Sequence, residues 1–469
     1  MLIGRIAEQE TLREALRKDQ SQFIAIYGRR RVGKTFLVRE TFNYKFTFQH
    51  TGLAKGKTSE QLMNFQESLK EYGYSDAPLP QTWLEAFSLL KQLIKNSRVR
   101  KKVIFIDELP WLDTPKSSFL SALEHFWNGW ATSRKDVVLI VCGSATSWII
   151  RKIVNNHGGL HNRITDKILL EPFTLAECES YSQSLGLVMS REQILESYMI
   201  LGGIPYYWSL LSAKKSLSQN IDALFFASNG KLTDEFDHLY ASLFKKKAPY
   251  IDIVSALSKK RGGMTREELI QLLKVNAGGQ LSQRLKELEQ CGFIRKYCTP
   301  GKKVKDAIYQ LIDNYTIFYF IFIQNNTGGD ERFWTSSIDA QFHRVWEGLA
   351  FERVVLQHII QVKKALEIGG VLTNVYSWRY QGEEGAQVDL VIDRRDDVIN
   401  LCEIKFSGGE YLIDKAYSKE LKQKRDVFRE QTKTRKAVHL TMITTEGVKR
   451  NVYYNDIQSE VTLDQLFAN

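Results

Sequence analysis

The chain has 469 residues, of which 43% are hydrophobic and 25% charged, a composition typical of folded proteins that excludes an intrinsically disordered chain. The length exceeds that of one ordinary core and indicates two to four domains. A formal net charge of +11 favours an acidic partner, with nucleic acid first and an anionic membrane surface second.

Neither export nor membrane insertion is expected from the sequence. The N-terminus, MLIGRIAEQETLREALRK, carries charges throughout and has no apolar core for export. The longest aromatic and apolar run, YTIFYFIFI at 315–323, is less than half the roughly 20 residues that a membrane helix needs. The five cysteines form no CxxC pair or zinc-ligand cluster, which favours reduced thiols. We therefore expect a cytoplasmic protein with no membrane partner.

Residues 1–168 are predicted to form a parallel α/β sheet, because helical patterns alternate with the short apolar runs FIAIY, VIFID and VVLIVCGS. The first run leads into GRRRVGKT at 28–35, which matches the phosphate-loop pattern GxxxxGK(S/T). Glycines there let backbone N–H groups face phosphates, the lysine reaches the terminal phosphates and the threonine ligates magnesium. The expected nucleotide contacts are Gly28, Arg31, Val32, Gly33, Lys34, Thr35 and Phe36. The side chains of the three loop arginines, Arg29 to Arg31, can point outward.

The second apolar run ends in two acidic residues, in VIFIDELPWL at 103–112. A parallel sheet would present both carboxylates beside the phosphate loop. Asp107 would hold the magnesium shell together with Thr35, and Glu108 could polarise the attacking water. The alternative is an acidic turn that caps the following helix. Together the two motifs predict a site for ATP and Mg²⁺.

Three later features carry weaker signals. Ser144 ends the run LIVCGS and could read the terminal phosphate, or it could cap the next helix. Arg163 in LHNRITDKILL is a candidate transition-state arginine, acting in its own chain or on a neighbouring subunit, or else a solvated surface residue. Pro205 in LGGIPYYW lies in a rigid turn that could lie on an adenine ring or simply join two helices.

Six segments of the first 210 or so residues resemble the archaeal-type ATPase family within the AAA+/STAND branch of P-loop NTPases: IGRIAEQETL, YGRRRVGKT, FIDELPWL, CGSATSW, HNRITDKI and GGIPYYW. The resemblance implies that Arg5 and Pro205 flank the nucleotide base. It also implies that Ser144 sits at the sensor position, and that Arg163 lies where the family often carries an arginine before its next strand.

The middle of the chain is predicted to be helical and then basic. Residues 169–245 show helical spacing in TLAECESYSQSL and SREQILESYMIL and are expected to form a helical lid. Residues 246–313 predict a winged helix-turn-helix, which is three helices followed by a hairpin. Within it, Thr265 and Glu268 form a capping box, and Gly292 ends the third helix.

The charges of this segment favour DNA. Residues 258–306 hold twelve Lys or Arg against five Asp or Glu. The third helix buries Leu281, Leu285 and Leu288 on one face, while other faces offer Gln280, Gln283, Arg284 and Lys286. Lys302, Lys303 and Lys305 would press on phosphates from the hairpin tip. The alternative is a spacer that packs on the ATPase and never contacts DNA.

The remainder, 314–469, resembles the restriction-endonuclease-like domain that often follows these ATPases, whose signature is PD-(D/E)xK. Asp389 in QVDLVID and Glu403 and Lys405 in LCEIKF match that signature, with Val388 in the place of its proline. Period-two alternation places Glu403 and Lys405 on one face, and a hairpin brings Asp389 to them. The two carboxylates would hold Mg²⁺ beside the scissile phosphate, while the lysine stabilises charge. The alternative is an amphipathic strand with solvated charges, or a nuclease fold with a silent site.

The sequence thus predicts an α/β protein with a P-loop NTPase sheet, a helical lid, a winged helix-turn-helix and a small nuclease-like α/β domain. The predicted function is an ATPase that couples its nucleotide state to double-stranded DNA binding, and to Mg²⁺-dependent cleavage if the last site is active, with a homo-oligomer also foreseen. The alternative is a slow ATP-dependent regulatory switch, in which the last two domains serve only as interaction modules. Attachment to a membrane surface through the lysines is disfavoured, because the basic segment lacks an amphipathic helix with aromatic anchors.

Overall fold

The computed structural model describes residues 2–155, 158–160, 162–244, 246–260, 262–298, 306–326, 328–380, 382 and 385–468. The chain divides into two compact units. The first comprises Met1–Pro172, Leu239–Lys247 and Gln290–Gly292, and the second comprises Phe173–His238, Ala248–Glu289 and Phe293–Asn469. No helix in these ranges is both long enough and apolar enough to cross a membrane.

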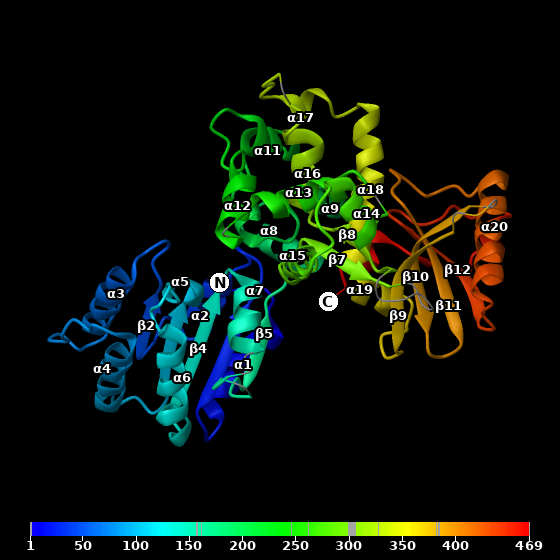
Figure 1. Cartoon of the computed structure of the whole chain (residues 1–469). Coiled ribbons are helices and arrows are strands. Elements are labelled where there is room, and N and C mark those ends of the chain that lie inside the picture. The colour runs from blue at the N-terminus through cyan, green and yellow to red at the C-terminus, as the bar shows by residue number, and fades with distance from the viewer. Residues whose placement is uncertain are drawn as a thin grey trace. The chain divides into compact units, whose positions relative to one another are not determined.

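The first unit contains a five-stranded sheet in which every neighbouring pair is parallel, as predicted (Figure 1). Its strand order is β2-β3-β4-β1-β5. The strands are β1 (Gln22–Tyr27), β2 (Phe48–Thr51), β3 (Lys102–Asp107), β4 (Val137–Gly143) and β5 (Asp166–Leu169). Strands β1, β4 and β3 are parallel neighbours, so the segments that follow them all begin at the same end of the sheet.

The helices of this unit pack against the sheet. They are α1 (Ile6–Arg17), α2 (Lys34–Thr41), α3 (Thr58–Glu71), α4 (Trp83–Asn96), α5 (Leu109–Leu112), α6 (Phe119–Gly129) and α7 (Thr146–Ile149). Helix α4 shows why: Trp83, Phe87, Leu90 and Ile94 recur at three- and four-residue spacing, and all are buried. They share one core with Phe23 of β1 and with residues of α3 and α6.

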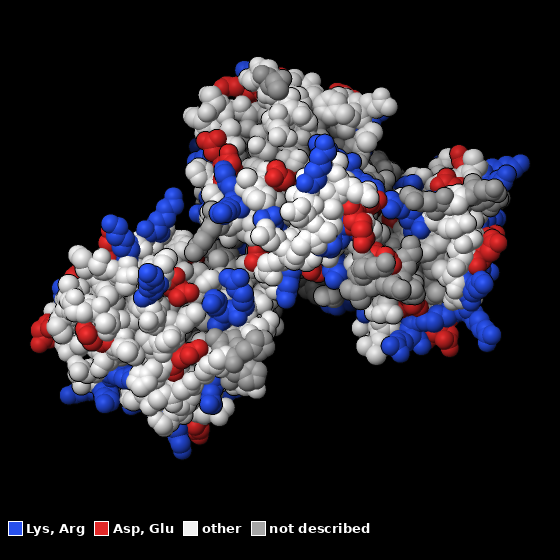
Figure 2. Space-filling view, in the orientation of Figure 1, with Lys and Arg blue, Asp and Glu red and all other residues white. Residues whose placement is uncertain are grey.

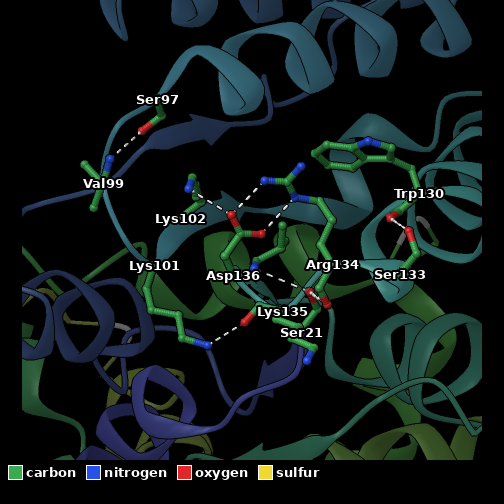
Figure 3. A network of polar contacts seen from close by, with 11 residues as sticks. Ser21, Ser97, Val99, Lys101, Lys102, Trp130, Ser133, Arg134, Lys135 and Asp136 are labelled. Atoms are coloured by element: carbon green, nitrogen blue, oxygen red, sulfur yellow. Dashed lines mark hydrogen bonds and ion pairs between the residues drawn. The ribbon is translucent and has the colours of Figure 1, made fainter.

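The opposite edge of the sheet, where β3 and β4 begin, is closed by an ion network around Asp136 (Figure 3). Arg134 donates two hydrogen bonds to the carboxylate, at 2.8 and 2.7 Å, and Lys102 Nζ lies 2.8 Å from it. Lys101 bonds to the carbonyl of Lys135 at 2.6 Å. Burial on its own raises the pKa of Asp136, but the hydrogen bonds from Arg134 and Lys102 outweigh it and lower the pKa to about 2.

The second unit begins with helices. They are α8 (Leu175–Ser184), α9 (Arg191–Leu201), α10 (Pro205–Trp208) and α11 (Leu217–Ile221), followed by α12 (Glu235–Leu243), which continues into the first unit. Three more helices follow with a small antiparallel sheet of order β6-β8-β7. These elements are α13 (Ala248–Ser258), β6 (Met264–Thr265), α14 (Arg266–Leu273), α15 (Gly279–Gln290), β7 (Ile294–Tyr297) and β8 (Ile308–Leu311).

Three local predictions within 246–313 are confirmed: the capping box, the end of the third helix at Gly292 and the pairing of the hairpin strands. Thr265 caps α14 and Glu268 completes the capping box. Gly292 has a φ of 74° just after α15, a left-handed conformation that glycine adopts readily. The hairpin pairs β7 with β8, whereas the tip residues Lys302, Lys303 and Lys305 lie outside the described residues.

The C-terminal part of the second unit is a five-stranded sheet of order β13-β12-β11-β10-β9. Strands β9 to β11 are antiparallel, and β11 to β13 are parallel. The elements are α16 (Asn314–Phe318), α17 (Phe333–Ser336), α18 (Gln341–Gln357), α19 (Ile359–Ala365), β9 (Thr373–Tyr380), β10 (Ala386–Arg394), β11 (Val398–Lys405), α20 (Lys415–Thr432), β12 (Ala437–Thr444), β13 (Ser459–Val461) and α21 (Leu463–Leu466).

Helices cover both faces of this second sheet (Figure 1). On one face, Phe428 of α20 packs on Trp378 of β9, with ring centroids 5.0 Å apart. On the other, Phe351 of α18 packs on Phe406, just after β11, at 5.9 Å. Successive residues of β11 therefore point alternately toward α20 and toward α18.

Candidate functional site

The loop between β1 and α2 folds tightly around its own lysine. Lys34 is buried, and its Nζ donates to the carbonyl oxygens of Gly28 at 2.9 Å and Arg29 at 2.8 Å. Gly28 has a φ of 144°, and a Cβ there would stand 2.3 Å from the carbonyl oxygen of Leu170, so only glycine fits. Gly33 has a φ of 92° and precedes α2, which begins at Lys34.

The pKa of Lys34 is set by burial and by the acidic groups around it. Burial lowers the pKa of Lys34, and the nearby Cys142, Glu108 and Asp107 oppose that effect. The ammonium group therefore lies among acidic side chains at the sheet edge and in the mouth of a glycine-bounded loop. That position suits a cation that meets the terminal phosphates of a nucleotide.

The loop arginines depart from the expectation that all three point outward. Arg29 is only 7% exposed, whereas Arg30 and Arg31 are half-buried. Arg31 itself has a left-handed φ of 69°. A loop that reverses direction over so few residues cannot send three successive side chains to the same side, so Arg29 turns inward. In the same region, Val32 is buried and Phe36 is exposed.

Asp107, the last residue of β3, receives three hydrogen bonds. Thr35 Oγ1 donates to its Oδ2 at 2.6 Å, and the backbone N–H of Glu108 donates to its Oδ1 at 2.8 Å. The thiol of Cys142, from β4, donates to Oδ1 at 2.6 Å. Burial, and then the charge of Asp107, raise the pKa of the Cys142 thiol well above its usual value, so the group stays protonated and remains a donor.

The oxygen groups of Thr35 and Asp107 fit a magnesium ion. Mg²⁺ binds through one or two protein oxygen ligands and keeps waters and phosphate oxygens for the rest of its octahedron. The Thr35 hydroxyl at the start of α2 and the Asp107 carboxylate at the end of β3 lie 2.6 Å apart, so two oxygen ligands stand side by side. Both side chains lie beside Lys34, where the terminal phosphates would be held.

Glu108 is fixed in an uncommon geometry. Its φ of 47° lies in the left-handed region, which is strained for a residue with a side chain and is often found at functional positions. Glu108 Oε2 accepts hydrogen bonds from both the backbone N–H and the hydroxyl of Ser144, each at 3.0 Å. Burial raises the pKa of Glu108, and the hydrogen bond from the Ser144 backbone opposes the rise. Two residues predicted separately from the sequence are therefore direct partners.

The remaining predicted residues lie in other segments of the chain. Arg5 precedes α1 with a φ of 56°, and its guanidinium donates to the carbonyl of Glu171, just after β5. Arg163 is exposed in the turn before β5. Pro205 opens α10 in the second unit. The roles assigned to these three residues stay predictions.

A second group of charged side chains lies on the C-terminal sheet. Glu403 of β11 is 3% exposed, and its Oε2 accepts from Lys424 Nζ at 2.8 Å and from the Tyr417 hydroxyl at 3.4 Å. Asp389 of β10 is also buried, and its Oδ2 accepts from the backbone N–H of Ile404 at 3.3 Å. Burial, and then the charge of Asp389, raise the pKa of Glu403 to about 7, against the lowering effect of Lys424.

The predicted acidic pair and lysine thus come together on β10 and β11. Lys405 Nζ lies 5.0 Å from the centroid of the Tyr417 ring, on the same face as Glu403. The magnesium site predicted there remains a prediction. Glu403 Oε1 is buried with no hydrogen-bond partner, but Oε2 is held by Lys424. Within the described ranges, no three His, Cys, Asp or Glu side chains gather as a metal-binding group. As arranged, these side chains fit an ion pair better than a magnesium shell.

Three contact residues were missed by sequence reasoning: Cys142, Tyr417 and Lys424. Cys142 meets Asp107 only because β4 lies beside β3, and strand order is not written in the local pattern. Tyr417 and Lys424 belong to α20, which follows β11 in the chain and folds back over it. Their seven-residue spacing places them on one helix face, which is the signal that could have found them.

Comparisons with known proteins find similarity both in sequence and in fold. Residues 2–211 match the model of an ATPase domain found predominantly in Archaea. An uncharacterised protein of Methanocaldococcus jannaschii, MJECL04, is 25% identical over 414 residues, which cover 87% of this chain and 88% of that protein. The Walker-type ATPase paby2304 of Pyrococcus abyssi has a similar structure, with a TM-score of 0.51 and 16% identity. That similarity covers 68% of this chain and 96% of the other.

The matched domain contains the whole phosphate loop and its acidic strand end, Lys34 and Thr35 on α2 and Asp107 and Glu108 after β3. The parallel sheet brings these residues together, because the ends of β1 and β3 lie at the same end of the sheet. Residues 2–211 are therefore similar to an archaeal-type ATPase domain, and this match together with the phosphate loop and the parallel sheet supports an ATP-hydrolysing P-loop enzyme.

Proposed function

We propose that ATP and Mg²⁺ bind at the loop between β1 and α2, and that the nucleotide state there controls DNA binding by residues 246–313. The observation that carries the first half is the 2.6 Å contact between Thr35 and Asp107, which supports a shared magnesium ligand pair. The second half is supported by the charge and arrangement of the elements that follow the ATPase domain.

Each side chain at the nucleotide site has a proposed role. The backbone N–H groups of 28–33 and the Lys34 ammonium hold the phosphates. Thr35 and Asp107 hold the magnesium ion, which neutralises charge on the transferred phosphoryl group when bound. Glu108 orients and polarises the attacking water, and Ser144, its hydrogen-bond partner, senses the terminal phosphate. Arg163 stabilises the transition state, in the same chain or in a neighbouring copy of a homo-oligomer.

Residues 246–313 are proposed to be a winged helix-turn-helix that binds duplex DNA. Leu281, Leu285 and Leu288 of α15 are buried, which leaves the polar faces of this helix for the major groove. Exposed on those faces are Gln280, Gln283 and Lys286, with Arg284 half-buried. Arg295 of β7 bonds instead to Ser377 of β9 at 3.0 Å, so this hairpin strand is anchored to the C-terminal sheet.

ATP turnover with and without duplex DNA, at two salt concentrations, tests this function. We expect DNA to change the turnover number at low salt, and the effect to shrink at high salt because released counterions weaken the phosphate contacts. If the protein hydrolyses ATP at the same rate with and without DNA at both salt concentrations, the coupling is refuted and the ATPase assignment stays intact.

The contact between Lys424 and Glu403 favours one role for the C-terminal sheet over the other. A carboxylate that already holds a tethered ammonium at 2.8 Å has one oxygen left for a metal. For this sheet we therefore favour an interaction module over Mg²⁺-dependent cleavage. Plasmid nicking by the full-length protein with Mg²⁺ tests this choice, with Asp389→Ala and Glu403→Ala as controls. Nicking that both variants abolish would establish the nuclease instead.

A further inference from the structure

Helix α20 is oriented by its apolar face, which leaves a long polar face in solvent. Leu421, Val427 and Phe428 are buried, and Phe428 packs on Trp378 of the sheet. Lys424 points the same way, toward Glu403. The orientation of the helix about its own axis is therefore fixed by contacts along its whole length.

The solvent face carries a row of cations, called here the α20 stripe: Lys415, Lys419, Lys422, Arg429 and Lys433. Successive members are four, three, seven and four residues apart, which places them on one side of a helix. All five are exposed. From first to last they span about 27 Å, at roughly 1.5 Å per residue.

The α20 stripe is poorly neutralised by the protein itself. Lys422 pairs with Asp456 at 2.8 Å. The other four members have no ion-pair partner in the part of the chain that the structure describes. Asp426 falls within the row but pairs with Arg425 at 3.0 Å. Around α20, Figure 2 shows Lys and Arg side chains at the surface with fewer acidic ones among them.

This local excess of charge is large. Residues 415–436 hold nine Lys or Arg against three Asp or Glu, which is a net charge of +6 on 22 residues. Members four residues apart stand about 6 Å from one another along the axis, within the roughly 8 Å Debye length of physiological salt, so they repel. A linear polyanion that lies along the helix would relieve that repulsion and release its own counterions.

Nucleic acid fits the stripe better than a membrane does. A membrane-surface helix presents Trp, Phe or Leu beside its cations. No large hydrophobic residue of α20 is exposed, since its apolar side chains are used on the sheet. What remains is charge without apolar anchors, which is the footprint of a surface that tracks a phosphate backbone.

We propose that the α20 stripe is a second DNA contact surface, which grips backbone phosphates without reading sequence and acts in addition to the winged helix. The proposal rests on the proposed function only in taking DNA as the ligand. It also gives the C-terminal sheet a purpose that needs no cleavage.

The test uses the full-length protein and a fluorescein-labelled duplex of random sequence, titrated over a series of salt concentrations. The stripe variant carries Lys415→Gln, Lys419→Gln, Arg429→Gln and Lys433→Gln. The matched control carries Lys95→Gln, Arg98→Gln, Arg100→Gln and Lys135→Gln, four exposed positions of the first unit with the same loss of charge. Thermal unfolding and ATP turnover without DNA are measured for both, and neither should change.

We expect the stripe variant to bind DNA at least about 10-fold more weakly at low salt, and the slope of log affinity against log salt to fall by about 2 to 4, with little change in the control. Equal affinity and slope in the two variants would overturn the proposal while leaving the wild-type DNA binding in place. A wild-type protein that does not bind DNA at low salt would overturn both this proposal and the function on which it rests. Binding to anionic phosphatidylserine vesicles that only the stripe variant loses, with DNA binding unaffected, would assign the surface to membranes and overturn it as well.

Discussion

Asp107 is held by a thiol as well as by the groups that a phosphate-loop motif leads one to expect. The hydroxyl of Thr35 fixes one carboxylate oxygen, while the thiol of Cys142 and the backbone of Glu108 fix the other. A carboxylate with both oxygens engaged has one orientation. Cys142 therefore positions the carboxylate that we propose as a magnesium ligand.

Replacing Cys142 with alanine should weaken magnesium binding. The Asp107 carboxylate would lose one of its three donors, which we expect to reduce Mg²⁺ affinity about 5- to 10-fold. The measurement is the Mg²⁺ dependence of fluorescent ATP-analogue binding, which does not require turnover. Cys142→Ser keeps a donor and should restore most of the affinity. Equal Mg²⁺ dependence in wild type and Cys142→Ala, or equal losses in both variants, would contradict this role.

Glu108 gives a prediction about rate and pH. Glu108→Gln should bind ATP normally and hydrolyse it about 100-fold more slowly, because an amide cannot take up the proton of the attacking water. Burial raises the pKa of Glu108, so turnover by the wild type should fall on the acid side at a pH above the ordinary carboxylate value of 4.5. Steady-state turnover from pH 5 to 8 measures this acid limb. If Glu108→Gln hydrolyses ATP as fast as the wild type, Glu108 does not activate the attacking water.

At the scale of single residues, the sequence predicted those side chains that follow strand ends in a known motif. Thr35, Asp107 and Glu108 are where the pattern placed them. Arg29 was allowed an outward direction and is buried, since its burial depends on the loop path and not on its polarity. Contacts made across strands or by a returning helix, such as those of Cys142 and Lys424, depend on topology that a local pattern does not contain.

At the scale of elements, an ion network joins the starts of two neighbouring strands of the first sheet. Strands β3 and β4 begin beside one another, and Asp136 ties their starts together through Lys102 and Arg134. The network lies at the sheet edge opposite the phosphate loop, so it bears on stability and leaves the nucleotide chemistry alone.

Asp136→Asn should therefore destabilise the protein without affecting ATP binding. The folded-state pKa of Asp136 is about 2, below its ordinary value of 3.8, so its contribution is full at neutral pH and is lost as pH falls from about 4 to 2. We expect a loss of about 1 kcal/mol at pH 7, discounted because the carboxylate is partly exposed. Denaturant unfolding at pH 7 and pH 2 measures the difference, with the exposed Asp19→Asn as control. A deficit of the same size at both pH values would contradict the account.

Element prediction succeeded where amphipathic patterns and caps were strong. The capping box of α14, the leucine face of α15 and the strands β10 and β11 all formed as expected. Farther along the chain, α18 and α19 are two separate helices that meet at His358. Strand β9 was not predicted, although Tyr376, Trp378 and Tyr380 recur at the two-residue spacing of a strand. Its pairing with β10 is a long-range contact that no local pattern contains.

At the scale of the whole molecule, the basic charge is concentrated in two segments. Residues 258–306 carry +7 and residues 415–436 carry +6, so the rest of the chain is close to neutral. Both segments follow the ATPase domain, and both belong mainly to the second unit. Positive charge in segments that follow the ATPase domain in the sequence is consistent with the proposed acidic partner.

The predicted domain boundaries at 168, 245 and 313 stay predictions. The two compact units separate near Pro172, but the first also includes Leu239–Lys247 and Gln290–Gly292. The grouping of these two short segments with the first unit depends on contacts between residues distant in the sequence. No change of local composition marks them in the sequence.

The most direct test of the central claim is equilibrium binding of a fluorescent ATP analogue with Mg²⁺ to the wild type and to Lys34→Ala. Lys45→Ala, an exposed lysine of the same unit, is the matched control, and thermal unfolding verifies that each variant is folded. We predict saturable, Mg²⁺-dependent binding by the wild type and Lys45→Ala, and a loss of at least about 30-fold in Lys34→Ala, because the ammonium that meets the terminal phosphates is gone. Wild-type affinity and an unchanged Mg²⁺ dependence in a folded Lys34→Ala variant would contradict the site.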